Sequence, residues 1–318
     1  MFVSLLSASR ADGSLYQLVG KIRQEDGKVF HGVVPVVSLF SNTTLFSMQA
    51  LADLSGGFRI KDVPPGPYTI NISVPHVGDL IQSVEIGPSF ADTKRRIVKE
   101  FLFRRKPPGK VSHVVSATQL SVPDKARGEY LKAQECLKRR NMKCANEHLL
   151  KAVKIAPQFS GAWNTLGTIA FQCKKLEEAE GYFREAFSQD PGHLLSLVNL
   201  GGTILLEGRL EEALPLNQAA VQSDPDDPLA QSQLGQNYFR LGQYDLAERH
   251  LRLARSLDQS HFTYPQLVLA DIYQRRRDFS SLVRELEEFL RLHPDSSKAP
   301  DVRRLLGYAR SRALATSN

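Results

Sequence analysis

The sequence predicts a chain of two domains, an all-β antiparallel sandwich followed by an all-α solenoid of helical hairpins. The first observation is a set of short β-rich segments between Tyr16 and Arg104, separated by clusters of Gly, Pro, Asp and Asn, which is typical of antiparallel sandwiches. The second is a helical pattern that repeats about every 34 residues from Ala126 to Pro294. With 318 residues, 42% of them apolar and 24% charged, the chain has the composition of ordinary globular domains.

The repeated pattern is clearest between Ser160 and Pro191. Small residues stand where two helices must approach and large apolar residues where gaps must be filled, at Trp163, Leu166, Gly167, Ala179, Phe183, Ala186 and Pro191. A shift of about 34 residues gives Glu129, Lys132, Ala133, Ala145, Leu149, Ala152 and Pro157, then Leu197, Leu200, Gly201, Ala213, Asn217, Ala220 and Pro225, then Gln231, Leu234, Gly235, Ala247, Leu251, Ala254 and Gln259. A fifth copy with one additional residue runs from Leu269 to Pro294. This pattern resembles the tetratricopeptide repeat family, which implies a right-handed solenoid with a concave groove for peptides or protein partners.

Each hairpin exposes an apolar face that only a neighbouring hairpin can cover. The last hairpin therefore needs a capping helix, and Asp301 to Leu314 fits that role with a stripe formed by Val302, Leu305, Leu306 and Ala309. Pro215 and Asn217 depart from the repeat pattern. We expect Pro215 to kink or shorten the second helix of the third hairpin, because proline removes a backbone donor.

The most informative β-rich stretch runs from Leu54 to Val74. Ser55-Gly56-Gly57 predicts a tight turn before Phe58 and Ile60, and Pro64-Pro65-Gly66 turns the chain into a strand that contains Tyr68. These motifs, with a first strand at Leu18 to Ile22, resemble the carboxypeptidase regulatory-like domain, a small transthyretin-like sandwich. The resemblance implies a non-catalytic accessory module. Because such modules are common on exported bacterial proteins, it favours an extracytoplasmic location, periplasmic or secreted, while a cytoplasmic location stays open.

We therefore divide the chain into a terminal segment (1–14), the sandwich (15–106), a linker (107–124), five repeats (125–296), and a capping helix with a tail (297–318). The first eleven residues are apolar but lack a basic leading region, so they are either the remnant of a secretory signal or a frayed terminus. No apolar run reaches the roughly 18 residues of a membrane-spanning helix, and no transmembrane segment is predicted.

The residue types that carry catalysis or bind metals do not occur at useful spacings. The eight histidines are scattered, and the sequence contains no His-Glu-x-x-His, Cys-x-x-Cys, Gly-x-Ser-x-Gly or phosphate-binding glycine motif. The sequence therefore predicts no enzyme, no cofactor and no metal site. Cys136 and Cys144 fall on the two helices of one hairpin, where they either form a disulfide in an exported protein or serve as small hydrophobic residues.

The basic residues are concentrated in one short stretch. The chain has 41 Lys and Arg against 34 Asp and Glu, a surplus of seven, and Lys94 to Lys110 alone holds eight basic residues and one acid, Glu100. A phosphate-binding or anionic-lipid patch is one interpretation. We favour a solvated last strand and linker, because a nucleic-acid surface would spread over a folded face. No nucleic-acid partner is predicted, and the packing residues of this strand are expected to be Ile97, Val98, Phe101 and Phe103.

The predicted function is that of a non-enzymatic adaptor or scaffold that binds a protein or peptide partner in the groove. First-helix positions not used for repeat packing should line it: Tyr130, Gln134, Asn164, Thr168, Val198, Leu205, Leu206, Gln236, Phe239, Arg240, Asp271 and Arg275. The apolar members of this set either anchor the partner or pack against neighbouring helices. In the alternative function, the sandwich holds a carbohydrate or envelope ligand through exposed aromatic residues and the solenoid is a spacer. The candidates for that role are Tyr16, Phe30, Phe40 and Phe46.

Overall fold

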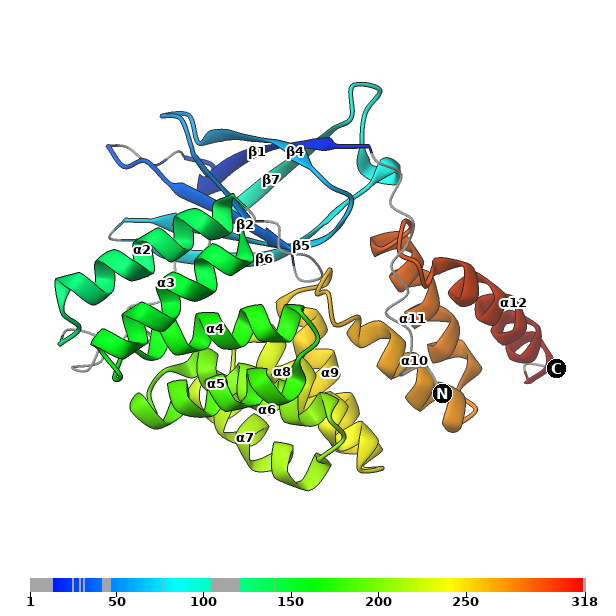
Figure 1. The fold of residues 1–318 in the computed structure, drawn as a ribbon. Helices are drawn as coiled ribbons and strands as arrows, with labels where there is room; N and C mark the ends of the chain where they lie inside the picture. The colour runs from blue at the N-terminus through cyan, green and yellow to red at the C-terminus, as the bar shows by residue number, and fades with distance from the viewer. Residues whose placement is uncertain are drawn as a thin grey trace. The chain divides into compact units, whose positions relative to one another are not determined.

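The computed structural model describes residues 14–24, 26–28, 30, 32–41, 47–75, 77–103, 121–139 and 141–316. These residues form two compact units. One unit combines the β-rich N-terminal domain with the chain from Asp258 onward, and the other contains the helices that end at Leu257. The predicted fold class is confirmed, since strands fill the N-terminal part and helices the C-terminal part (Figure 1). Residues 1–13 and most of the predicted linker lie outside the described residues.

The N-terminal domain consists of two sheets (Figure 1). The three-stranded sheet has the order β4-β1-β7, with β1 at Tyr16–Gln24, β4 at Gly57–Val63 and β7 at Arg96–Phe103. The four-stranded sheet has the order β3-β2-β5-β6, with β2 at Val36–Ser41, β3 at Ser47–Leu51, β5 at Gly66–Val74 and β6 at Gly78–Ile86. The pairs β1–β4, β2–β5 and β5–β6 are antiparallel, as predicted. The pair β1–β7 is parallel, because β7 enters beside β1 after the chain crosses over from the other sheet.

The residues singled out in the sequence hold the sandwich together. Gly20 in β1 lies opposite Phe58 in β4, and a Cβ atom at Gly20 would come within 2.0 Å of the Phe58 ring. Glycine at this position therefore leaves room for the aromatic side chain. Tyr68 is 1% exposed, and its hydroxyl donates to the carbonyl of Pro64 at 2.8 Å, which closes the Pro-Pro-Gly turn. Asp53 accepts bonds from the backbone N–H groups of Ser55 and Gly57, fixing the preceding turn.

Strand β7 corrects one detail of the predicted packing. Ile97, Phe101 and Phe103 are buried, as expected, because they alternate on the inner face. Val98 is 71% exposed, since it has the opposite parity and lies on the outer face. The prediction that Val98 packs in the core is therefore wrong.

The solenoid unit contains four helical hairpins (Figure 1). They are α2 (Asp124–Lys138) with α3 (Met142–Ile155), α4 (Ser160–Gln172) with α5 (Leu176–Gln189), α6 (Leu194–Leu206) with α7 (Leu210–Ser223), and α8 (Pro228–Arg240) with α9 (Tyr244–Leu257). A disulfide joins Cys136 in α2 to Cys144 in α3, and Cys136 also belongs to the apolar cluster of this hairpin. Because the bridge closes a short loop between two helices, it stabilises the hairpin by restricting the unfolded chain.

The third hairpin tolerates its unusual residues. Pro215 lies inside α7, which still has 14 residues, the same length as α5 and α9. The expectation that proline shortens this helix is wrong. Asn217 is fully buried, and its amide donates to the side-chain oxygen of Asn237 at 3.1 Å, while Asn237 donates to the carbonyl of Leu210 at 3.0 Å. This amide chain pairs the Asn217 amide N–H group where the other hairpins place an apolar side chain, while the buried Asn217 Oδ1 has no hydrogen-bond partner among the described residues.

The compact unit that contains the sandwich also contains three helices: α10 (Pro265–Arg275), α11 (Phe279–Leu292) and α12 (Ala299–Thr316). His293, at the end of α11, is fully buried, and its Nδ1 lies 3.0 Å from a carboxylate oxygen of Glu85 in β6. The backbone N–H of Ser83 donates to the carboxylate of Asp258 at 2.9 Å. These contacts tie β6 to the C-terminal helices across more than half the chain. No helix among the described residues is long and apolar enough to span a bilayer.

Two glycine substitutions should have opposite effects on the solenoid. A Cβ atom at Gly167 in α4 would come within 2.5 Å of the buried Phe183 ring, so Gly167→Ala should lower the free energy of unfolding by about 1–3 kcal/mol. Gly181 in α5 is exposed and has no atom within 4 Å of that position, so Gly181→Ala should raise it by about 0.5–1 kcal/mol. Urea unfolding followed by circular dichroism measures both, and equal effects would contradict the close packing at Gly167.

A buried histidine should make the unit that contains the sandwich sensitive to acid. Burial lowers the pKa of His261 to about 4. The unfolded chain takes up a proton on this ring near pH 6.5, so the stability that the neutral ring contributes is complete above that pH and is lost as the pH falls toward 4. NMR titration of the His261 ring in the full chain should give a midpoint near 4. A midpoint near 6.5 would show that the ring is exposed to water.

Candidate functional site

The first helices of the four hairpins lie next to one another in sequence order, because lateral hydrogen bonds join them. The Tyr130 hydroxyl of α2 lies 3.3 Å from the Thr165 hydroxyl of α4, and the Asn199 amide of α6 donates to the side-chain oxygen of Asn164 in α4 at 2.9 Å. The Arg240 guanidinium of α8 donates to the carbonyl of Leu205 in α6. Each of these pairs is separated by 35 residues in the sequence. We call the surface formed by α2, α4, α6 and α8 the first-helix face.

A second set of bonds fixes where the first helices begin. The indole N–H of Trp163 donates to the carbonyl of Pro157 at 2.8 Å, and the amide of Gln231 donates to the carbonyl of Pro225 at 2.7 Å. The two residues occupy the same position of the repeat, six residues after the accepting proline. A side-chain donor at this position holds the preceding turn against the start of α4 and of α8.

The predicted groove residues fall into three classes. Asn164, Thr168, Gln236, Phe239, Arg240 and Tyr130 are half-buried, while Gln134 and Leu206 are exposed. Val198 and Leu205 are almost fully buried, at 1% and 3% exposure, and belong to apolar clusters between hairpins. For these two side chains the structure therefore selects packing against neighbouring helices, the alternative considered for the apolar members of the set. The assignment of the set to a partner site stays a prediction.

The remaining two predicted residues lie in the other compact unit. Asp271 and Arg275 are in α10, and the Arg275 Nε donates to the Asp271 carboxylate at 3.0 Å. The first-helix face is therefore described from the four hairpins of the solenoid unit alone.

Leu195, which stands eleven residues before Leu206 in α6, is not among the predicted groove residues. Eleven residues are close to three whole turns, so the two leucines share one face of the helix. Leu195 is 60% exposed and Leu206 is 53% exposed. The same periodicity that assigns core positions could have identified this pair, had it been applied to the first residue of the helix.

On α4, α6 and α8 the chemistry of this face differs from that of the second helices. Near α5 and α7, Arg209 forms ion pairs with Glu180, Glu207 and Glu212, and these carboxylates raise the pKa of Arg209. The first-helix positions named above carry mainly neutral amides, hydroxyls and leucine side chains. Such groups can donate and accept hydrogen bonds from a peptide backbone and cover its apolar side chains, without requiring a charged partner.

Two of the four aromatic residues proposed to hold a ligand on the sandwich are buried. Tyr16 and Phe30 are 6% and 7% exposed, and the Phe30 ring packs against Phe103 at 5.4 Å between ring centres. Phe40 is 37% exposed, and Phe46 lies outside the described residues. Tyr16 and Phe30 thus serve the core, and the structure gathers no set of exposed rings from these candidates.

Comparison with known proteins identifies the helical repeats. Two family models described as tetratricopeptide repeat match residues 164–228 and 205–272. The C-terminal part therefore contains tetratricopeptide repeats, as the sequence pattern predicted. No curated protein has a significant match to the chain.

Solved structures support the fold at low sequence identity. PilF of Pseudomonas aeruginosa is 17% identical with a TM-score of 0.50, covering 57% of this chain and 82% of its own. A tetratricopeptide repeat protein of Parabacteroides merdae is 20% identical with a TM-score of 0.50, covering 61% and 77%. A double mutant of MamA from Desulfovibrio magneticus RS-1 is 20% identical with a TM-score of 0.50, covering 56% and 99%. These similarities concern the fold alone.

The lateral bond between Asn164 and Asn199 should contribute to stacking of the second and third hairpins. Replacing Asn199 with alanine leaves the half-buried Asn164 without this partner, and we expect a loss of about 0.5–1.5 kcal/mol in the free energy of unfolding. The double change with Asn164→Ala should cost less than the sum of the single changes, because both remove the same bond. Urea unfolding of the four proteins measures this coupling, and strict additivity would show that the bond contributes nothing.

Proposed function

We propose that the chain is a non-enzymatic adaptor that binds a segment of a protein partner on its first-helix face. The observation that carries this proposal is the exposed pair Leu195 and Leu206, which share one face of α6, in the interior of the row of first helices. The residues beside them on α4 and α8 include the half-buried Asn164, Thr168 and Gln236. Apolar anchors flanked by neutral hydrogen-bonding groups suit a peptide segment that buries two side chains and pairs part of its backbone.

The spacing of the two leucines limits the partner's geometry. Eleven residues of helix correspond to roughly 16 Å along its axis. An extended segment spans that distance with about five residues, and a helical segment needs about eleven. We therefore propose that the partner segment carries two large apolar side chains at one of these spacings.

We also propose that the N-terminal domain is a carboxypeptidase regulatory-like module with an accessory, non-catalytic role. Two observations support it. Gly56 has a positive φ and packs against the Ile22 carbonyl, which explains the glycine before Phe58, and the bond from Tyr68 to Pro64 explains the Pro-Pro-Gly turn. The accessory role follows from the resemblance in sequence.

Affinity capture from extract of the source cells tests the binding proposal. The full chain is compared with Leu195→Glu and Leu206→Glu, singly and together, and with Leu150→Glu as a matched control. Leu150 is 47% exposed on α3, a second helix, so the control makes the same chemical change at similar exposure away from the face. A specific partner should be retained by the unaltered chain and the control, and each change on the face should weaken its titrated affinity about tenfold or more.

All variants must first show the same helical circular dichroism and melting temperature as the unaltered chain. A partner that binds all variants equally would place the binding site elsewhere on the molecule. If the control variant also fails to retain the partner, the changes have disrupted the structure in general, and circular dichroism would reveal this.

A further inference from the structure

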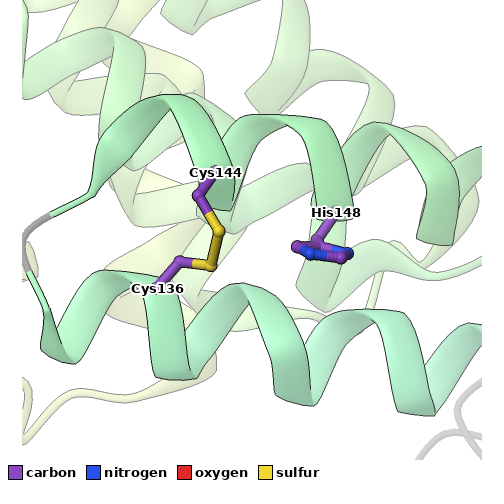
Figure 2. A group of neighbouring side chains, drawn as sticks. All are labelled: Cys136, Cys144 and His148. Atoms are coloured by element: carbon purple, nitrogen blue, oxygen red, sulfur yellow. A yellow bond between two sulfur atoms is a disulfide. The ribbon is translucent and has the colours of Figure 1, made fainter.

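Three side chains with metal-binding chemistry meet in the first hairpin (Figure 2). Cys144 and His148 are four residues apart on α3, so they share one face of that helix, and Cys136 reaches them from α2. One ligand atom from each, the two sulfurs and a ring nitrogen, all lie within 4.8 Å of one another. The sulfurs are joined as a disulfide in this structure. The predicted sites did not include this cluster: Cys144 and His148 stand at an i, i+4 spacing on α3, but Cys136 comes from the other helix and is brought to them only by the fold.

Ordinary hairpin packing explains only part of this arrangement. His250 occupies the same repeat position in the fourth hairpin, where its Nδ1 lies 2.8 Å from the side-chain oxygen of Gln231. His148 makes the corresponding contact with Glu129, at 2.7 Å from Nδ1, across the same separation of 19 residues. A histidine with a polar partner is therefore a recurrent packing device. The two cysteines and the carboxylate partner are specific to the first hairpin.

The carboxylate of Glu129 prepares His148 for metal binding. The Glu129 carboxylate accepts from Nζ of Lys132 at 2.6 Å and lies 2.7 Å from Nδ1 of His148. A carboxylate that accepts from Nδ1–H holds the proton on that nitrogen and leaves the lone pair of Nε2 available to a metal ion. This is the outer-shell arrangement that metal-binding histidines commonly use.

A pocket of about 290 Å³ adjoins the cluster and leaves room for a further ligand. Glu135 contributes to its lining together with both cysteines and His148. The two cations at the pocket already have partners, since Lys132 pairs with Glu129 at 2.6 Å and Arg139 pairs with Glu135 at 3.3 Å. The charge that opposes a bound cation is thereby reduced.

We propose that the reduced form of this hairpin binds one zinc-class divalent ion through Cys136, Cys144 and His148, with Glu135 or water as the fourth ligand. An external dithiol breaks the disulfide by supplying two electrons and two protons, and is itself oxidised to a disulfide. A phosphine supplies the two electrons and becomes a phosphine oxide, while water supplies the oxygen and the two protons. Either reaction yields two thiols. Each thiol releases its proton when its sulfur binds the metal. Two thiolates and an imidazole are ligands that zinc prefers over magnesium or calcium, and two thiolates balance its charge.

The geometry favours this exchange of one cross-link for another. Two sulfurs bound to one tetrahedral zinc ion stand roughly 3.8 Å apart, given Zn–S bonds of about 2.3 Å. Reduced sulfurs must separate by a similar distance to avoid overlap, so the dithiol form is close to the metal-binding arrangement. The disulfide and the metal exclude each other, and either one joins α2 to α3.

Cobalt and zinc titrations of the full chain test the proposal. The protein is reduced with a phosphine under anaerobic conditions and titrated with Co²⁺, whose absorption reports tetrahedral coordination and thiolate ligation, and then with Zn²⁺. We expect one equivalent of Co²⁺ with thiolate charge-transfer absorption, displaced by one equivalent of Zn²⁺. The oxidised protein should show neither signal. Cys136→Ser, Cys144→Ser and His148→Asn should each weaken binding at least tenfold, and Glu129→Gln should weaken it about 10- to 100-fold while keeping the absorption.

Two matched variants serve as controls. Cys173→Ser alters the free, exposed cysteine, and His250→Asn alters the equivalent histidine of the fourth hairpin. Neither should change the affinity, and all variants must match the metal-free chain in circular dichroism. The proposal is overturned by the absence of stoichiometric binding to the reduced chain, by cysteine variants that bind as well as the unaltered chain, or by binding that is insensitive to His148→Asn.

Discussion

Helical hairpins in the solenoid unit bury their apolar surfaces against one another, and the approach of the two helices within each hairpin depends on a pair of facing positions. Gly167, Gly201 and Gly235 occupy one of these positions in successive hairpins, and a Cβ atom at each would come within 2.3 to 2.7 Å of the opposing side chain. Those side chains are Phe183, Asn217 and Leu251. The second helix can therefore lie directly against the first. Stacking of whole hairpins, and the lateral bonds between first helices, follow from this close approach.

The periodicity of the sequence predicted the helices well because repeat packing acts at short range. It assigned apolar residues to the buried side of a helix where four copies of the repeat agree. It could not tell which of two consecutive residues at the end of a helix is buried. Leu205 is buried and Leu206 is exposed, although consecutive residues differ by only about 100° around the axis. Leu205 packs in an apolar cluster that includes residues of the preceding hairpin, so contact between hairpins decides which of the two leucines is covered, and a single helix does not contain that information.

Contacts between residues far apart in the sequence explain the other features of the structure that the sequence did not predict. Strand β7 pairs in parallel with β1, and no turn motif can signal a partner that enters after a crossover. Glu85 and His293 meet in the interior although they are 208 residues apart in the sequence. Neither residue belongs to a recognisable motif, and burial of such a pair depends on desolvation and mutual contact that only the folded chain establishes. The motifs at Phe58 and Tyr68, by contrast, were recognisable in the sequence because their contacts lie within a few residues or within one pair of strands.

The first hairpin shows how a cross-link can replace apolar contacts. The position held by Leu166, Leu200 and Leu234 in the following hairpins is Lys132 here, and the glycine that allows close approach is Ala133. The Lys132 side chain is 61% exposed and pairs with Glu129 instead of filling the core. A hairpin that lacks this apolar contact gains less from burial. The bond between Cys136 and Cys144 supplies the missing restraint, and a metal held by the same side chains would supply it when the bridge is reduced.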